Sequence, residues 1–211
     1  MDDIRDQLFD AIVDGKMTAA PGLVQTALDA GVSPGDLLQG SMIPAMREVG
    51  ALFEDGEYFV PQMLLSARAM QAGLEVLRPR LAETGMRAIG KVVIGTVQGD
   101  LHEIGKNLVT IMMEGVGFEV IDLGVDVKPA AFVEAVQAHR PDVVGLSALL
   151  TTTMPQLQLT IQALREAGAL EGARVMVGGA PVTAEFAQKI GADGFASDAS
   201  HAAELARSYV A

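Results

Sequence analysis

His102 is the residue of this chain best suited to chemistry, because it stands two positions after Asp100 in the segment GDLHEIG, residues 99–105. A neutral imidazole can bind a metal through one ring nitrogen. A carboxylate that accepts a hydrogen bond from the other nitrogen fixes the tautomer and makes the ring a stronger ligand. A lone loop histidine is more often simply solvated, so this pair needs support from other segments.

Two further segments carry groups that could reach the same ligand. Residues 147–153 (SALLTTT) supply hydroxyl groups that can donate hydrogen bonds to ring nitrogens or to phosphate. Residues 178–181 (GGAP) contain a glycine pair that leaves room for backbone to touch a bulky ligand. Each pattern alone is typical of a cap or a tight turn, so the prediction depends on all three segments meeting in one crevice.

The chain from Lys91 onward alternates apolar runs with amphipathic segments, which predicts strands followed by helices. This alternation indicates a parallel, doubly wound α/β sheet with right-handed crossovers. Five strands fit the flavodoxin-like order 2-1-3-4-5, in which the loops after the first and third strands flank the switch point and the fourth strand lies beside it. The expected strands are 92–97, 119–122, 142–146, 174–177 and 194–196, with helices beginning near Ile104, Pro129, Pro155, Thr183 and Ala199.

Residues 1–82 show helical periodicity and almost no strand pattern. One helix is expected around residues 4–12, a second around 23–28, a third from Asp36 to about Phe53, and a fourth from about Pro61 to Leu81. Ser33 and Pro34 look like an N-cap and a first-turn proline for the third helix. Four such helices form a small antiparallel bundle.

The change of pattern between the two halves predicts two domains, and the composition excludes several function classes. A helical domain with its linker is expected over residues 1–87 and an α/β domain over 88–211, with a hinge at 83–88 that pivots at Gly85. Half of the 211 residues are apolar, as in globular proteins, and the net charge of −12 argues against nucleic-acid binding. No cysteine is present for a thiolate ligand. A signal peptide and an apolar run of about 20 residues are also absent, which predicts a cytoplasmic protein without a membrane partner.

The chain has no second histidine or carboxylate cluster placed to complete an all-protein metal site. A single histidine ligand points to a metal that arrives with its own equatorial ligands, as in a macrocycle. His139 and His201 are not expected to be ligands, because His139 ends a helix and His201 lies in the first turns of the last helix.

The three motifs at these spacings resemble the cobalamin-binding domain of corrinoid proteins, a Rossmann-like domain. Residues 99–107 match the family's Asp-x-His-x-x-Gly motif continuously, and residues 147–149 and 178–179 match its Ser-x-Leu and Gly-Gly motifs. The preceding helices resemble the bundle that caps the cofactor in methionine synthase and in small corrinoid proteins, with residues 58–62 similar to the cap segment. The resemblance covers nearly the whole chain.

This resemblance implies that cobalamin binds here, as methylcobalamin or a related corrinoid, with His102 as the lower ligand of cobalt and Asp100 on its other nitrogen. Thr153, where methionine synthase has serine, would extend that relay, and Ser147 would contact the displaced base. The remaining implied cofactor contacts are Gly105, Gly178 and Gly179 in the slot for the nucleotide tail, Leu149 and Thr151 in the second loop, and Phe59 and Met63 over the upper methyl face.

The function that the resemblance implies is methyl transport. The chain would carry a methyl group on cobalt from a substrate-specific methyltransferase to a second methyltransferase that acts on a thiol or folate, with a reductive activase as a further partner. It would be a carrier component and not a complete enzyme, because the chain contains no further catalytic domain.

Three alternatives stay open on the sequence. A subunit of an adenosylcobalamin mutase shares the cobalamin motif but does not use this helical bundle. A cobalamin-dependent regulator can share both parts, but it would need a basic DNA-binding module, which this sequence lacks. A nucleotide or flavin module is disfavoured because the chain has neither G-x-G-x-x-G nor a Walker motif.

Overall fold

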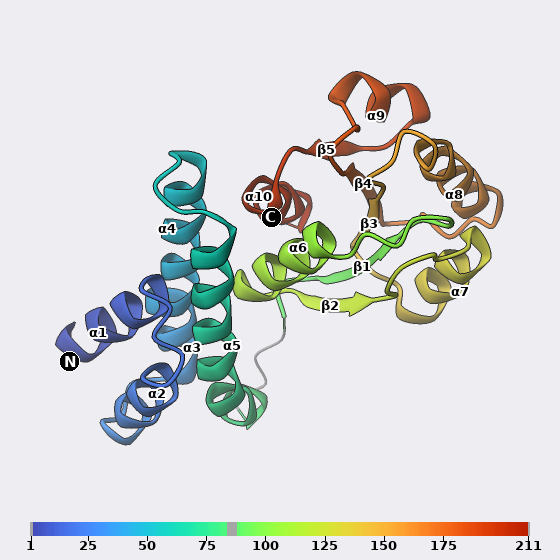
Figure 1. Cartoon of the computed structure of the whole chain (residues 1–211). Helices are drawn as coiled ribbons and strands as arrows, with labels where there is room; N and C mark the ends of the chain where they lie inside the picture. Colours follow the sequence, from blue (N-terminus) through green and yellow to red (C-terminus); the bar gives the residue numbers. More distant parts are fainter. Residues whose placement is uncertain (1, 84–87, 211) are drawn as a thin grey trace. The chain divides into compact units, whose positions relative to one another are not determined.

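The computed structural model describes residues 2–83 and 88–210 (Figure 1). The chain forms two compact units, one made of Met1–Ala88 with Gly115–Gly117, the other of Ile89–Glu114 with Phe118–Ala211. Most of the expected hinge, residues 84–87 with Gly85, lies outside the described residues. Among the described helices, none combines the length and the apolar character that crossing a membrane requires.

The first unit is a bundle of helices that pack pairwise: α1 (Asp2–Val13), α2 (Ala20–Asp29), α4 (Ile43–Glu54) and α5 (Val60–Glu83). The end of α1 is tied to α5, because the Ser66 hydroxyl donates a hydrogen bond of 2.7 Å to the Val13 carbonyl. Tyr58 donates to the same carbonyl at 3.2 Å. The predicted helical bundle is confirmed.

The third predicted helix is not one regular α-helix. It begins at Pro34, where the Ser33 side chain accepts a hydrogen bond from the Asp36 amide at 3.0 Å, so the predicted cap is confirmed. A short α3 (Pro34–Leu37) then passes through a π-helical turn, η1 (Leu38–Met42), before α4 begins. Pro44 has no N–H to give the Gly40 carbonyl, which explains a local widening of the helix at this point.

The second unit contains a parallel five-stranded sheet in the order β2-β1-β3-β4-β5, which confirms the predicted topology. Its strands are β1 (Lys91–Thr96), β2 (Glu119–Asp122), β3 (Val143–Ser147), β4 (Arg174–Gly178) and β5 (Gly194–Ala196). Each strand end lies within one residue of its predicted place. Asp142 comes directly before β3, and its carboxylate accepts a hydrogen bond from the Lys91 amide at the start of β1.

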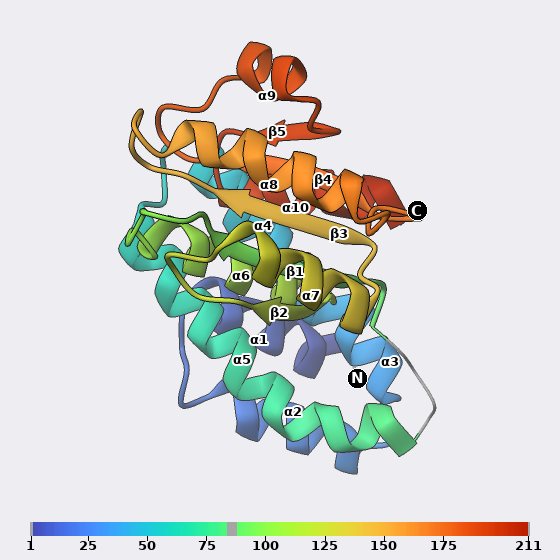
Figure 2. The same ribbon diagram turned by 90° about the vertical axis from the view of Figure 1, so that its right-hand side faces the viewer.

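Helices cover both faces of this sheet, as Figures 1 and 2 show. One face is covered by α7 (Pro129–His139) and α8 (Met154–Glu166), the other by α6 (Ile104–Gly115) and α10 (Ala199–Val210), while α9 (Ala184–Ile190) lies beside β5. Side chains alternate along β1, so that Val93 and Val97 enter the core under α7 and α8. Gly95 belongs to the same face, because a Cβ there would meet the Phe132 ring at 2.8 Å.

Candidate functional site

The candidate site lies where β1, β3 and β4 end together. Thr96 of β1 pairs with Ser147 of β3, and Ser147 pairs with Gly178 of β4, so the three following loops leave the sheet at one level. This carboxyl edge is where an open α/β sheet binds ligands. The predicted convergence of the three loops is therefore a feature of the fold.

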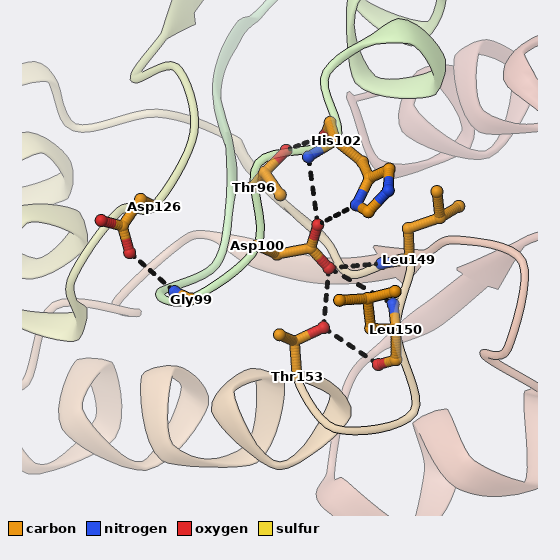
Figure 3. Close-up of polar contacts among 8 residues, drawn as sticks. All are labelled: Thr96, Gly99, Asp100, His102, Asp126, Leu149, Leu150 and Thr153. Atoms are coloured by element: carbon orange, nitrogen blue, oxygen red, sulfur yellow. Dashed lines mark hydrogen bonds and ion pairs between the residues drawn. The ribbon is translucent and has the colours of Figure 1, made fainter.

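Asp100 and His102 form a close pair on the first of these loops (Figure 3). Asp100 Oδ1 lies 2.6 Å from His102 Nδ1 and accepts a hydrogen bond of 3.1 Å from the His102 amide. The Asp100 side chain is 0% exposed, whereas that of His102 is 48% exposed. With Nδ1 donating to the carboxylate, Nε2 keeps its lone pair, and the described residues give that nitrogen no hydrogen bond.

The second oxygen of Asp100 is held by the loop after β3. Oδ2 accepts hydrogen bonds from the Thr153 hydroxyl at 2.6 Å and from the Leu149 amide at 2.7 Å, with the Leu150 amide at 3.3 Å. Burial by itself raises the pKa of the Asp100 carboxyl, but the bonds from Thr153, Leu149 and His102 outweigh burial and hold that pKa well below its usual range. Asp100 is therefore an anion that accepts hydrogen bonds on both oxygens.

The contact between Thr153 and Asp100 is the one expected for that hydroxyl. The two leucine amides are a part of the site that sequence reasoning missed. Their side chains give no indication of the role, because the backbone N–H groups make the bonds; only the position of the loop after β3 could have suggested it. Leu149 was expected as a cofactor contact; in the structure its amide supports the carboxylate behind His102, and its side chain is exposed.

Exposed apolar side chains surround the histidine on these two loops. Leu101 and Ile104 are 72% and 75% exposed, and Leu149 and Leu150 are also exposed. Large apolar side chains with this exposure are uncommon in one place on a soluble protein and mark a binding surface. A flat ligand with an apolar edge would cover them.

The glycines of the site differ in what surrounds them. Gly179 has φ +126°, and a Cβ there would lie 1.9 Å from the Ala148 carbonyl oxygen. The close approach of the β3 loop therefore requires a glycine at this position, whichever ligand the site binds. A Cβ on Gly178 would lie 3.1 Å from the Ala196 carbonyl oxygen, whereas one on Gly105 would meet no atom within 4 Å. Gly105 alone leaves open space at the start of α6.

A buried lysine fixes that start of α6. The Lys106 ammonium forms an ion pair with Asp122 at the end of β2, and it donates a hydrogen bond of 2.6 Å to the Asn107 side chain. The lysine side chain is almost fully buried, so removing Asp122 would leave a buried charge without its partner and would destabilise the fold. It ties the helix that follows the His102 loop to the neighbouring strand.

The remaining predicted residues occupy less distinctive places. Ser147 is partly buried at the end of β3, and Thr151 is exposed in the turn that follows. In the helical unit, Phe59 is 62% exposed, but Met63 is fully buried. A contact between the Met63 side chain and a cofactor would first require this side chain to be uncovered, so only Phe59 is presented as expected.

The other two histidines lie where the sequence placed them. His139 is the last residue of α7, and His201 is in the first turn of α10, where its amide donates a hydrogen bond of 2.8 Å to Asp198. Across residues 2–83 and 88–210, no group of three or more histidine, aspartate or glutamate side chains is arranged to hold a metal ion. The donor set at His102 therefore fits a metal that brings its other ligands with it, above an apolar rim and beside the open space at Gly105.

Comparison with known proteins also indicates a corrinoid-binding chain. Residues 90–206 and residues 4–78 each match a family model described as a B12 binding domain. A corrinoid protein of Desulfitobacterium hafniense is 41% identical over 95% of this chain and 94% of its own length. Trimethylamine corrinoid protein 1 of Methanosarcina acetivorans is 44% identical over 87% of this chain and 86% of its own length.

A solved structure extends the likeness to the whole chain. The methanol:cobalamin methyltransferase complex of Methanosarcina barkeri includes a chain that is 30% identical, with a TM-score of 0.87, covering 100% of this chain and 80% of that one. Both units thus have counterparts in proteins named for corrinoids. The chain belongs to the B12 binding domain family and, within it, to the corrinoid proteins of methyltransferase systems.

Proposed function

We propose that this chain carries a methyl group on a bound corrinoid between a substrate-specific methyltransferase and a second methyltransferase that acts on a thiol or folate. The observation that carries this proposal is the Asp100–His102 pair. A buried anionic carboxylate holds Nδ1 of a half-exposed imidazole, and this leaves Nε2 as a free ligand at the carboxyl edge of the sheet.

Each proposed site residue has a distinct task. His102 would bind the metal through Nε2, and Asp100 would keep the ring in the correct tautomer, with Thr153 fixing the carboxylate. Ser147 would contact the displaced base, and the open space at Gly105 would admit the nucleotide tail. When bound, the corrinoid supplies a cobalt centre that accepts and releases a methyl group.

The helical unit favours the carrier over the alternatives. It matches a B12 binding model of its own, and relatives named corrinoid proteins align with both units. Neither of the two relatives named above is described as a mutase subunit or a regulator. Partnership with a methyltransferase fits the solved methanol:cobalamin methyltransferase complex. A reductive activase, an acceptor methyltransferase and a cytoplasmic location are part of the same proposal.

Two measurements test the proposal directly. The purified chain, reconstituted with cobalamin, should show the absorption spectrum of a protein-bound corrinoid. Incubation with a candidate methyl donor and its methyltransferase should then change that spectrum to the methylated form. A chain that binds no corrinoid under reducing or oxidising conditions would refute the proposed function.

A fragment of residues 88–211 is expected to bind cobalamin without the helical unit. The reason is that His102, its partners on Asp100, and the loops after β3 and β4 all belong to the α/β unit. Binding is measured by spectral titration, with the same fragment carrying His102→Gln as the control. If the full chain binds and the folded fragment does not, the helical unit supplies part of the main site.

Two glycine substitutions should separate folding from binding. Gly179→Ala is expected to lower the free energy of unfolding by at least about 2 kcal/mol, since its Cβ would collide with the Ala148 carbonyl in a left-handed backbone conformation. Gly105→Ala meets open space within α6 and should leave stability unchanged or raise it by up to about 1 kcal/mol.

Cobalamin affinity gives the second readout for this pair. Gly105→Ala should weaken binding, because its methyl group enters the space proposed for the nucleotide tail. Thermal unfolding and spectral titration of the two variants check both expectations. A Gly105→Ala chain that binds cobalamin as tightly as the wild type would remove Gly105 from the proposed slot.

A further inference from the structure

The loop between β2 and α7 is hydrogen-bonded along the loop that carries His102. The Thr96 amide donates to the Gly124 carbonyl at 2.9 Å, and the Val127 amide donates to the Thr96 carbonyl at 3.0 Å. Thr96 in turn donates its hydroxyl to the His102 carbonyl at 2.9 Å. A segment with no predicted role is therefore bonded to Thr96, the residue that holds the His102 carbonyl.

Asp126 makes the contacts nearest to the ligand pair. Its Oδ1 accepts a hydrogen bond of 2.7 Å from the Gly99 amide (Figure 3). Its own amide donates to the Asp100 carbonyl at 2.9 Å. These two bonds lie on either side of the peptide that joins Gly99 to Asp100. The Asp100 amide also donates to the Val97 carbonyl at 3.1 Å, so both the N–H and the C=O of Asp100 are hydrogen-bonded.

The backbone of Asp126 adopts a conformation that is unusual for a residue with a side chain. Its φ is +53°, in the left-handed region that few residues other than glycine, asparagine and aspartate adopt readily. A glycine would adopt it with less strain but would offer no acceptor to Gly99. The side chain is thus the feature that distinguishes aspartate from glycine at this position.

We propose that Asp126 is a positioning residue for His102, an inference that rests on the proposed function. By fixing the Gly99–Asp100 peptide, it aims the Asp100 carboxylate at Nδ1 of the imidazole. The carboxylate then keeps the tautomer in which Nε2 is free to bind the metal. Without the Asp126 carboxylate, the Asp100 carboxylate would hold its position less firmly. The His102 ring would then also populate the tautomer in which Nε2 carries the proton.

Three variants of the full chain separate the hydrogen bond from the backbone conformation. Asp126→Gly keeps the left-handed backbone and removes the acceptor, while Asp126→Asn keeps both. Asp142→Ala is the matched control, because the Asp142 carboxylate accepts a bond of the same length, 2.7 Å, from the Lys91 amide at the opposite end of β1. Asp126 is exposed, so none of these changes disturbs the core.

The first readout needs no cofactor. Nitrogen-15 signals of the His102 ring report the tautomer, and hydrogen exchange reports the Gly99 amide. Asp126→Gly should speed exchange at Gly99 by roughly tenfold and shift the ring signals toward a mixture of tautomers. Asp126→Asn and Asp142→Ala should keep the wild-type ring signals. Faster exchange at Gly99 with unchanged ring signals would reduce Asp126 to a structural brace and overturn the proposal.

The second readout uses the reconstituted protein in its Co(II) state. The fraction of cobalt that shows histidine nitrogen coupling in electron paramagnetic resonance should fall in Asp126→Gly and stay at the wild-type level in the other two variants. An equal fraction in all four chains would also overturn the proposal. If the wild-type chain binds no corrinoid, the proposed function fails, and the ring signals of the cofactor-free chain still decide the role of Asp126.

Discussion

Replacing His102 with glutamine should abolish the histidine nitrogen coupling that we expect for cobalt in the reconstituted protein. Wild-type protein with nitrogen-15 histidine should show ligand coupling in the electron paramagnetic resonance of its Co(II) state, and His102→Gln should show none. Losing an outer partner of a metal ligand costs roughly 10- to 100-fold in affinity, so losing the ligand should weaken corrinoid binding at least that much. Glutamine keeps an N–H donor for the Asp100 carboxylate, and the half-exposed site has room for its side chain.

The other two histidines provide matched controls. His139→Gln and His201→Gln change the same side chain at the end of α7 and in the first turn of α10, away from the Asp100 network. Both variants should keep the wild-type coupling and affinity. Coupling that survives in His102→Gln and disappears in either control would assign the ligand to a different histidine.

The fold was largely predictable because its determinants are local in the sequence. Pro129 and Pro155 mark the first turns of α7 and α8, and the Thr183 side chain caps α9 by accepting from the Phe186 amide at 3.1 Å. Such signals need no knowledge of the rest of the chain. The exception was the π turn before α4, where Pro44 acts on a carbonyl four residues earlier and the residue pattern still looks like an ordinary helix.

The site was predictable in its side chains and not in its backbone. Asp100 and His102 follow from residue type and spacing, and Thr153 follows from the resemblance to corrinoid proteins. The structure places the polar atoms of all three within hydrogen-bonding distance. The Leu149 amide and the collision that makes Gly179 necessary depend on how closely two loops approach. No residue type encodes that approach, so these features appear only when the sheet is assembled.

Replacing Asp100 with asparagine should lower the free energy of unfolding by about 3 kcal/mol. The wild-type carboxylate accepts hydrogen bonds on both oxygens, from His102 on one side and from Leu149 and Thr153 on the other. An amide has one acceptor end and one donor end, so its NH₂ group must face either the backbone amide of His102 or that of Leu149. Leaving buried donors unpaired costs about 1 to 3 kcal/mol each. Chemical denaturation of the cofactor-free chain measures the difference.

The difference in unfolding free energy between the wild type and Asp100→Asn should also change with pH, in a direction that the pKa of Asp100 sets. The pKa of the Asp100 carboxyl is held below its usual range in the folded chain, whereas in the unfolded chain it is about 3.9. The stabilisation from its charge is therefore complete well above pH 4 and is lost as the pH falls toward the folded value. Asparagine does not titrate, so the gap in unfolding free energy between the two chains should narrow below about pH 4.

This comparison is cleanest when both chains also carry His102→Gln, so that Asp100 is the only ionisable member of the pair. Thr153 and the Leu149 amide still stabilise the Asp100 anion in that background, which preserves the direction of the effect. The measurement is urea unfolding at a series of pH values from neutral to acidic. A gap that widens on acidification, or that does not change with pH, would mean that Asp100 is not held as an anion at this edge of the sheet.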